Sequence, residues 1–150
     1  MRDLNFPRQY DFDYRTVEDK VAIFDPIRRK YVQLTPEEWV RQNLVQYCVQ
    51  DLNYPPGLIV IEKSLDYHGT QCRADVVVHN RQAQPLLMAE CKAPEVNITQ
   101  DVFDQIARYN RVLRTKYLVV TNGVTHYCYA IDHEHGEYDF LNALPRYEEL

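Results

Sequence analysis

The fold of this chain is decided by one stretch, RADVVVHNRQAQPLLMAECK, which covers residues 73–92. Two apolar runs, 73–79 and 86–92, flank a short polar segment, a pattern typical of two antiparallel strands joined by a turn. If the turn centres between Gln82 and Ala83, residues whose numbers add up to 165 face each other, and Asp75 lies opposite Glu90. Side chains two apart on a strand share a face, so Lys92 joins these two carboxylates.

Two carboxylates opposite each other on neighbouring strands have Cβ atoms only about 4.5–5.5 Å apart and repel unless a positive charge lies between them. Mg²⁺ suits this place, because it binds through one or two carboxylates and keeps several waters; Mn²⁺ is the other candidate. The alternative is a Lys–Asp–Glu cluster that merely solvates an open sheet face. The flanking runs 76–78 and 86–89 are too apolar for such a face. The spacing therefore favours a metal site with ligands Asp75 and Glu90, in which Lys92 orients water or stabilises a phosphate.

Two helices flank this hairpin in the sequence. Thr35 before Pro36 is a strong helix start, with Glu38 placed to complete a capping box, and apolar residues at helical spacing continue to about Asp51. A second helix is predicted from a cap at Thr99 to about Arg114.

Further strands are predicted at 21–24, 30–34, 58–65, 117–121 and 126–131. The order gives an α/β (α+β) fold class, a mixed central sheet flanked by helices. We expect a single domain with a β-hairpin annex (1–34), a core (35–132) and an irregular C-terminal tail (133–150). The segment His133-Glu134-His135-Gly136 in the tail has no zinc-type partners and is predicted to be a turn.

Composition narrows the class of protein. The 150 residues are 45% hydrophobic and 26% charged, which is ordinary for a soluble domain, and no apolar run is long enough for a membrane span. A signal peptide is not evident, so we expect a cytoplasmic protein. Four widely spaced cysteines are expected to be reduced and mostly buried. The net charge of −5 means that nucleic acid would have to be bound by a local basic patch or with a partner.

The residues Arg73-Ala74-Asp75, followed fifteen positions later by Glu90-Cys91-Lys92, resemble the PD-(D/E)XK nuclease signature. The stretch from Gln105 to Tyr109 is similar to the Gln-x-x-x-Tyr helix motif of related nucleases, and Thr121-Asn122-Gly123 follows the next strand. Together these motifs, from about residue 35 to 130, resemble the N-terminal nuclease domain of type I restriction enzyme R subunits. The resemblance implies a restriction-endonuclease-like core that the annex lies outside. Ala74 stands where some members have Pro.

The resemblance also implies further site residues. The backbone carbonyl of Cys91 would be a metal ligand, while its thiol points to the opposite face. A Glu on the first helix often assists such sites, and a helical wheel places Glu37 inside the apolar arc and Glu38 outside it. We therefore expect Glu37 to face the sheet and Glu38 to act as a cap. Gln105, at the border of the buried face, would reach the metal-bound water or a phosphate.

Basic residues gather in two places. Arg108, Arg111 and Arg114 form a stripe on the second helix away from its apolar face, either a solvated surface or a phosphate track. Residues 28–30 form a second short cluster in the annex turn.

The leading hypothesis is a Mg²⁺-dependent endonuclease domain that hydrolyses phosphodiester bonds in DNA. Two rivals stand beside it: an inactive nuclease-fold module that binds nucleic acid or a protein, and a subunit that docks on a restriction or repair motor. The chain lacks the P-loop of the helicase motor that R subunits carry, so a helicase or restriction subunit is an expected partner. A homodimer would supply the two sites that two-strand cleavage needs.

Overall fold

The computed structural model describes residues 1–150 and contains two α-helices, nine strands and two short 3-10 turns. The elements are β1 (Tyr14–Val17), β2 (Lys20–Asp25), β3 (Lys30–Gln33), α1 (Pro36–Asp51), η1 (Pro56–Leu58), β4 (Ile59–Tyr67), β5 (Thr70–His79), β6 (Pro85–Cys91), α2 (Gln100–Leu113), β7 (Tyr117–Thr121), β8 (His126–Asp132), β9 (Glu137–Leu141) and η2 (Tyr147–Glu149). No helix is long and apolar enough to cross a membrane.

Both helices begin and end where local signals predict. The Thr35 hydroxyl accepts a hydrogen bond from the Glu38 amide, and Pro36 occupies the first turn of α1. The Thr99 hydroxyl caps α2 through the amide of Val102, and α2 ends at Arg114 in the left-handed conformation. A side-chain cap satisfies one of the amides that a helix start leaves without an intrahelical partner, so these bounds are fixed by the sequence around them.

The main sheet has six strands in the order β4-β5-β6-β7-β8-β9. All neighbours are antiparallel except β6 and β7, which are parallel and are connected through α2. The β5–β6 register is the predicted one, with Val76 opposite Ala89 and Val77 opposite Met88, and it shifts only after Val78. Strand alternation from this register places Asp75 and Glu90 side by side.

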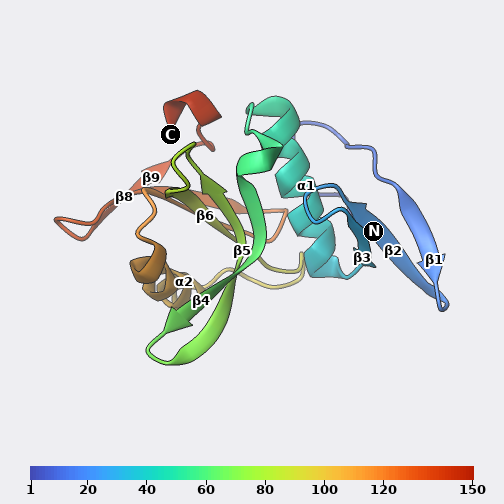
Figure 1. Ribbon diagram of the computed structural model, residues 1–150, viewed down its shortest axis with the longest axis horizontal. Coiled ribbons are helices and arrows are strands. Elements are labelled where there is room, and N and C mark those ends of the chain that lie inside the picture. The colour runs from blue at the N-terminus through green and yellow to red at the C-terminus, as the bar shows by residue number, and fades with distance from the viewer.

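The core has two layers, one on each face of the main sheet. Val76 and Ala89 belong to a cluster built with α1, whereas Val77 and Met88 belong to a cluster with Ile106 of α2. Helices on both faces of a mixed sheet explain why the central strands are almost wholly apolar. Figure 1 shows α1 between the six-stranded sheet and the separate sheet β1–β3.

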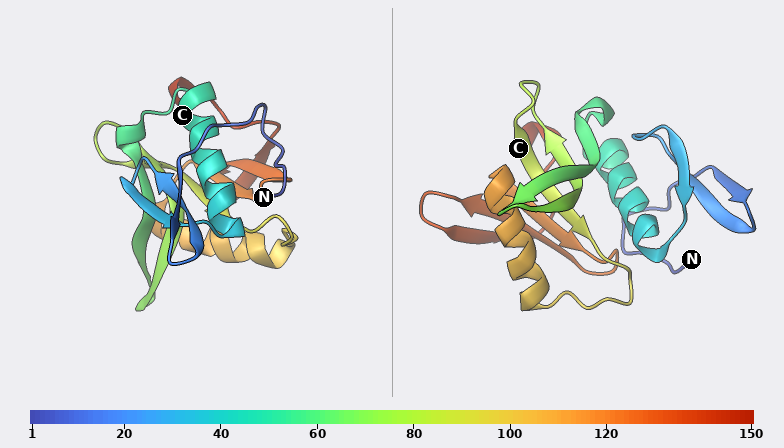
Figure 2. Two further views of the ribbon diagram at one scale, coloured as in Figure 1. Left: turned by 90° about the vertical axis from the view of Figure 1, so that its right-hand side faces the viewer. Right: turned by 60° about the horizontal axis from the view of Figure 1, so that its bottom comes forward.

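The N-terminal residues form more than the predicted hairpin. Strand β1 adds to β2 and β3, which makes a three-stranded antiparallel sheet. Before it, residues 1–13, here called the N-terminal strap, cross α1 and reach the β7–β8 turn (Figure 2). There the Asn5 amide donates to the carbonyl of Gly123, and the Trp39 indole of α1 donates to the carbonyl of Arg2. The strap therefore joins α1 to the main sheet.

The tail differs from the prediction. Residues 133–136 form the predicted turn, but they lead into β9, which pairs with β8 along its full length. The expectation of an irregular tail was wrong: residues 137–140 alternate polar and apolar side chains, and the rings of Tyr138 and Phe140 contact those of Phe103 and Tyr129.

Candidate active site

Asp75 is a buried carboxylate on β5 with a hydrogen-bond donor at each oxygen. Oδ2 accepts from the backbone amide of Cys91 at 2.7 Å, and Oδ1 accepts from Arg41 Nη1 at 3.4 Å. Burial raises the pKa of Asp75, and the Cys91 amide and the Arg41 guanidinium oppose that rise. The two donors fix the plane of the carboxylate and favour its ionised form.

The carboxyl of Glu90 on β6 interacts electrostatically with that of Asp75 but is poorly satisfied by hydrogen bonds. Its Oε2 atom is buried and has no hydrogen-bond partner. Burial raises the pKa of Glu90 to about 8, and the negative charge of Asp75 adds to this, while Lys92 opposes it. Two buried carboxyls with an unpartnered oxygen between strands form a site that a proton or a cation stabilises.

This pair fits a hard divalent cation. Both side chains offer oxygen ligands, and Mg²⁺ is commonly held by only one or two carboxylates. No group of three or more His, Cys, Asp or Glu side chains is close enough to hold a metal, so a cation here would depend on Asp75, Glu90 and a backbone carbonyl such as that of Cys91. The Cys91 thiol itself is fully buried in the cluster around α1, as strand alternation predicts.

Lys92 directly follows β6 and lies near the carboxyl pair. Its backbone amide donates to the carbonyl of Thr121, which extends the β6–β7 pairing by one bond. Its ammonium lowers the pKa values of Asp75, Glu90 and Glu37 through charge alone and forms no direct ion pair. The lysine is therefore close to the pair and uncommitted, which leaves its protons for a substrate.

The helix-wheel prediction for Glu37 and Glu38 was wrong about burial. Glu38 is buried, at 5% exposure, and Glu37 is exposed. The Thr35 cap forms, but the Glu38 carboxylate does not return to the Thr35 amide, which donates to Gln33 instead. Glu37 still interacts with the site, because partial desolvation of its carboxyl and the charge of Asp75 raise its pKa. Its site role stays a prediction.

Glu38 is buried because a second layer of residues covers α1. A helical wheel with a single apolar face does not account for such a layer. Arg28 of the β2–β3 turn donates to Glu38 Oε1 at 2.7 Å, and Arg41 donates to Glu38 Oε2 at 2.8 Å. Burial pushes the pKa of Glu38 upward, but the hydrogen bonds from Arg41 and Arg28 outweigh it and lower this pKa to about 2. Because Arg28 is committed here, the predicted basic cluster at 28–30 shrinks to Arg29 and Lys30.

These contacts extend into a continuous chain of alternating charges. Asp25 is fully buried and accepts from Arg28, Arg28 and Arg41 share Glu38, and Arg41 reaches Asp75. The charge chain, as we call these five side chains, links the annex to the candidate site. Sequence reasoning missed it, although the i, i+3 spacing of Glu38 and Arg41 was a signal for one of its pairs.

The remaining predicted residues lie on the exposed side of α2. Gln105 is exposed and donates to the Tyr109 hydroxyl at 3.2 Å, and no contact joins it to the carboxyl pair. Arg108, Arg111 and Arg114 are exposed as predicted. Nothing in their contacts assigns them a ligand, so their roles stay predictions.

The motif Thr121-Asn122-Gly123 holds the loop that follows Lys92. Asn122 is buried, its Nδ2 donates to the carbonyl of Val96 at 2.9 Å, and its Oδ1 accepts from the amides of Val124 and Thr125. One side chain therefore closes the β7–β8 turn and fixes the loop between β6 and α2. This role was not evident from the sequence.

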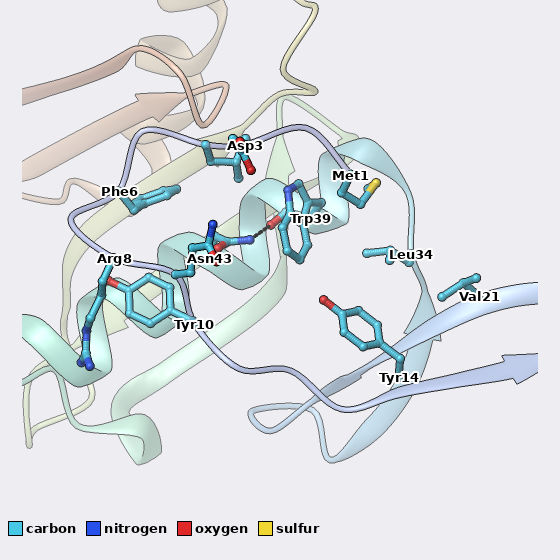
Figure 3. Close-up of a pocket in the computed structure, with 12 residues that line it drawn as sticks. Met1, Asp3, Phe6, Arg8, Tyr10, Tyr14, Val21, Leu34, Trp39 and Asn43 are labelled. Atoms are coloured by element: carbon cyan, nitrogen blue, oxygen red, sulfur yellow. Dashed lines mark hydrogen bonds between the residues drawn. The ribbon is translucent and has the colours of Figure 1, made fainter.

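The largest cavity lies away from the carboxyl pair. It has a volume of about 420 Å³ and opens between the N-terminal strap, β2 and α1, with the rings of Tyr10, Tyr14 and Trp39 around it (Figure 3). None of the predicted site residues lines it. The candidate site therefore lies outside this cavity.

Comparisons with known proteins identify the family and the fold. The family model of the type I restriction enzyme R protein N terminus (HSDR_N) matches residues 36–145. No curated protein matches the chain. A solved fragment described as an HsdR subunit of a type I restriction enzyme from Vibrio vulnificus YJ016 is similar, with 22% identity and a TM-score of 0.57 over 78% of this chain and 24% of that one.

A second solved structure, the type IIG restriction endonuclease BpuSI, matches at 20% identity and a TM-score of 0.43 over 73% of this chain and 13% of that one. The chain therefore spans about a quarter or less of either solved protein. The Vibrio fragment shows that the fold is shared, and the family match covers the core and most of the tail while leaving out the annex. On these grounds the chain belongs to the family of type I restriction enzyme R protein N-termini.

Proposed function

We propose that this domain is a Mg²⁺-dependent endonuclease that hydrolyses phosphodiester bonds in DNA, with Mn²⁺ as a substitute metal. The observation that carries the proposal is the Asp75–Glu90 pair, in which one carboxyl accepts hydrogen bonds from two donors and the other has a buried oxygen without a partner. Such a pair, with a free lysine beside it, has the groups that metal-assisted hydrolysis needs.

Each side chain has a distinct task in this proposal. Asp75 and Glu90 would hold the cation together with the Cys91 carbonyl, and the cation would supply an activated water and neutralise charge on the phosphate. Lys92 would orient the attacking water or stabilise the negative charge that develops on the phosphate. Glu37 and Gln105 would assist from the two helices, and Arg108, Arg111 and Arg114 would contact the DNA backbone.

The test is cleavage of plasmid DNA by the purified protein with and without Mg²⁺. We expect nicking or cutting that depends on the metal and that falls at least about a hundredfold in Asp75→Asn and Lys92→Met. Asp139→Asn is a matched control, because Asp139 is an exposed carboxylate on β9. Equal activity in all four proteins would point to a contaminating nuclease and contradict the proposal.

The partner is also a proposal. The family consists of the N-terminal part of restriction enzyme R proteins, so we propose that the domain works with a helicase or restriction subunit, or as a homodimer. If the protein binds DNA and Mg²⁺ but never cuts, alone or with such a partner, the rival reading as a binding module replaces the enzyme.

A further inference from the structure

A second site lies at the other end of β5, where a lysine and a histidine meet. Lys63 of β4 and His79 of β5 lie 2.9 Å apart, Nζ to Nε2. His79 Nδ1 lies 3.2 Å from the carbonyl oxygen of Leu58, and because a carbonyl can only accept, Nδ1 carries the proton. The Nε2 atom of the neutral ring then accepts from the Lys63 ammonium.

The positive charge of Lys63 has no counter-ion. Neither Lys63 nor Arg81 takes part in an ion pair. Burial and the Lys63 charge lower the pKa of His79, and no carboxylate acts on the ring. Lysine is normally solvated or paired with a carboxylate, and here it is instead held by a neutral imidazole that is 6% exposed.

The pair borders a hollow. A cavity of about 320 Å³ lies between the start of β4 and the β5–β6 turn, lined by Lys63, His79 and Arg81 and by no acidic residue. Arg81 is exposed at its mouth. A fixed ammonium and a mobile guanidinium facing one hollow without a carboxylate are arranged for an oxyanion with several acceptor oxygens.

We infer that this hollow, bounded by Lys63, His79 and Arg81, binds a phosphate group of a nucleic-acid strand. His79 acts as a positioning residue, because its acceptor nitrogen holds Lys63 in place without neutralising it. The hollow and the Asp75–Glu90 pair are four residues apart on β5, about 13 Å at the rise of a strand. A DNA strand covers that length with about four phosphates.

The identity of the phosphate as part of a strand rests on the proposed function, whereas the anion site itself does not. A free or terminal phosphate has the same chemistry. The experiment therefore has two arms, and both omit the divalent metal so that no cleavage occurs and the result is independent of whether the protein cuts.

In the first arm, binding of a fluorescent DNA duplex is measured in EDTA by anisotropy over a range of salt. We expect Lys63→Met to weaken binding about tenfold and to reduce the slope of log K against log salt by about 1, as loss of one phosphate contact does. Lys63→Arg should retain most of the affinity. Lys20→Met removes an equal charge from the exposed annex and should behave as the unaltered protein does.

In the second arm, inorganic phosphate is titrated while the His79 ring resonances are followed by NMR. Shifts that saturate in the unaltered protein and vanish in Lys63→Met support a phosphate site. If phosphate shifts the His79 ring resonances but DNA affinity is the same in Lys63→Met and Lys20→Met, the site binds free phosphate. The proposal that it binds a nucleic-acid strand is then overturned. If DNA affinity is the same in Lys63→Met and Lys20→Met, and phosphate causes no saturating shift of His79 that depends on Lys63, the whole inference is overturned. Circular dichroism confirms that the variants are folded.

Discussion

Asp75 and Glu90 form a buried pair of carboxyls that differ in their partners: Asp75 has a donor at each oxygen, and Glu90 Oε2 has none. The asymmetry assigns the charge to Asp75 and the proton to Glu90 when no metal is bound. It also means that the empty pair costs free energy once Glu90 must ionise, and that a cation offsets this cost. If the site holds a metal as proposed, metal binding and stability are linked there.

The first prediction is a pH dependence of the metal-free protein. The pKa of Glu90 is about 8 in the folded state, above its ordinary value of 4.5, so the folded state holds a proton that the unfolded state releases. Stability from this group is fully present below about pH 4.5 and is lost as the pH rises towards 8. Thermal unfolding in EDTA should show a decline over this window, and Mg²⁺ at pH 8 should reverse it.

Glu90→Gln is the control for that prediction, because a neutral amide of similar shape has no proton to lose. We expect this variant to be more stable than the unaltered protein at pH 8 without metal and to show neither the decline nor the Mg²⁺ effect. A decline that persists unchanged in Glu90→Gln would assign the pH dependence to other groups.

The second prediction distinguishes the role of Lys92 from that of the proposed metal ligands. Lys92→Met should abolish cleavage while Mn²⁺ still binds, with equal or higher affinity, because a positive charge that competes for the carboxyl pair is gone. Asp75→Asn should lose both properties. Mn²⁺ affinity measured by electron paramagnetic resonance checks this, and loss of Mn²⁺ binding in Lys92→Met would make the lysine a structural member of the pair.

The third prediction concerns the charge chain between annex and site. Glu38→Gln should destabilise the fold by about 3 kcal/mol, since it removes the carboxylate that the half-buried Arg28 and the buried Arg41 share at 2.7 and 2.8 Å. Their other partners are Asp25, Glu62 and Asp75. Glu37→Gln, one residue away and exposed, should change stability by less than about 0.5 kcal/mol. Urea unfolding at pH 7 measures both, and similar values for the two variants would show that the chain contributes little.

These residues also show how far the sequence leads. The bounds of α1 and the β5–β6 register were predictable, because both depend on neighbours in the sequence: the Thr35 cap, Pro36, and apolar strands around a polar turn. Continuing that register by one residue places Asp75 opposite Glu90. The hydrogen-bond donors that distinguish the two carboxyls could not be predicted from the sequence, since Arg41 comes from another element.

What was missed depends on contacts between distant segments. Strand β1 is exposed throughout and shows no alternation, so it becomes a strand only through β2. The burial of Glu38 depends on Arg28, ten residues earlier, which covers a side of α1 that a wheel treats as solvent. The close contact between the strap and the main sheet at Gly123 is equally non-local, because a Cβ there would lie 2.8 Å from the Leu4 side chain.

The last prediction tests whether Asn122 places the loop that carries Lys92. Asn122→Asp keeps an oxygen for the amides of Val124 and Thr125 but cannot donate to the Val96 carbonyl, so the turn should persist while the loop is released. We expect faster hydrogen exchange in residues 93–98 and a several-fold lower kcat at unchanged Mn²⁺ affinity, because a lysine displaced by a fraction of an ångström stabilises the reacting phosphate less well.

Asp132→Asn is the matched control, since Asp132 also closes a turn by accepting from two amides, those of Glu134 and His135, but lies on the β8–β9 turn. It should leave exchange at 93–98 and kcat as they are. Asn122→Ala loses the turn as well as the bond to Val96 and should be the least stable of the three variants, by about 1–3 kcal/mol for the buried groups left unpaired. If Asn122→Asp and Asp132→Asn behave alike in exchange and in kcat, the loop is held by the Lys92 amide and Thr121 alone, and Asn122 serves only the turn.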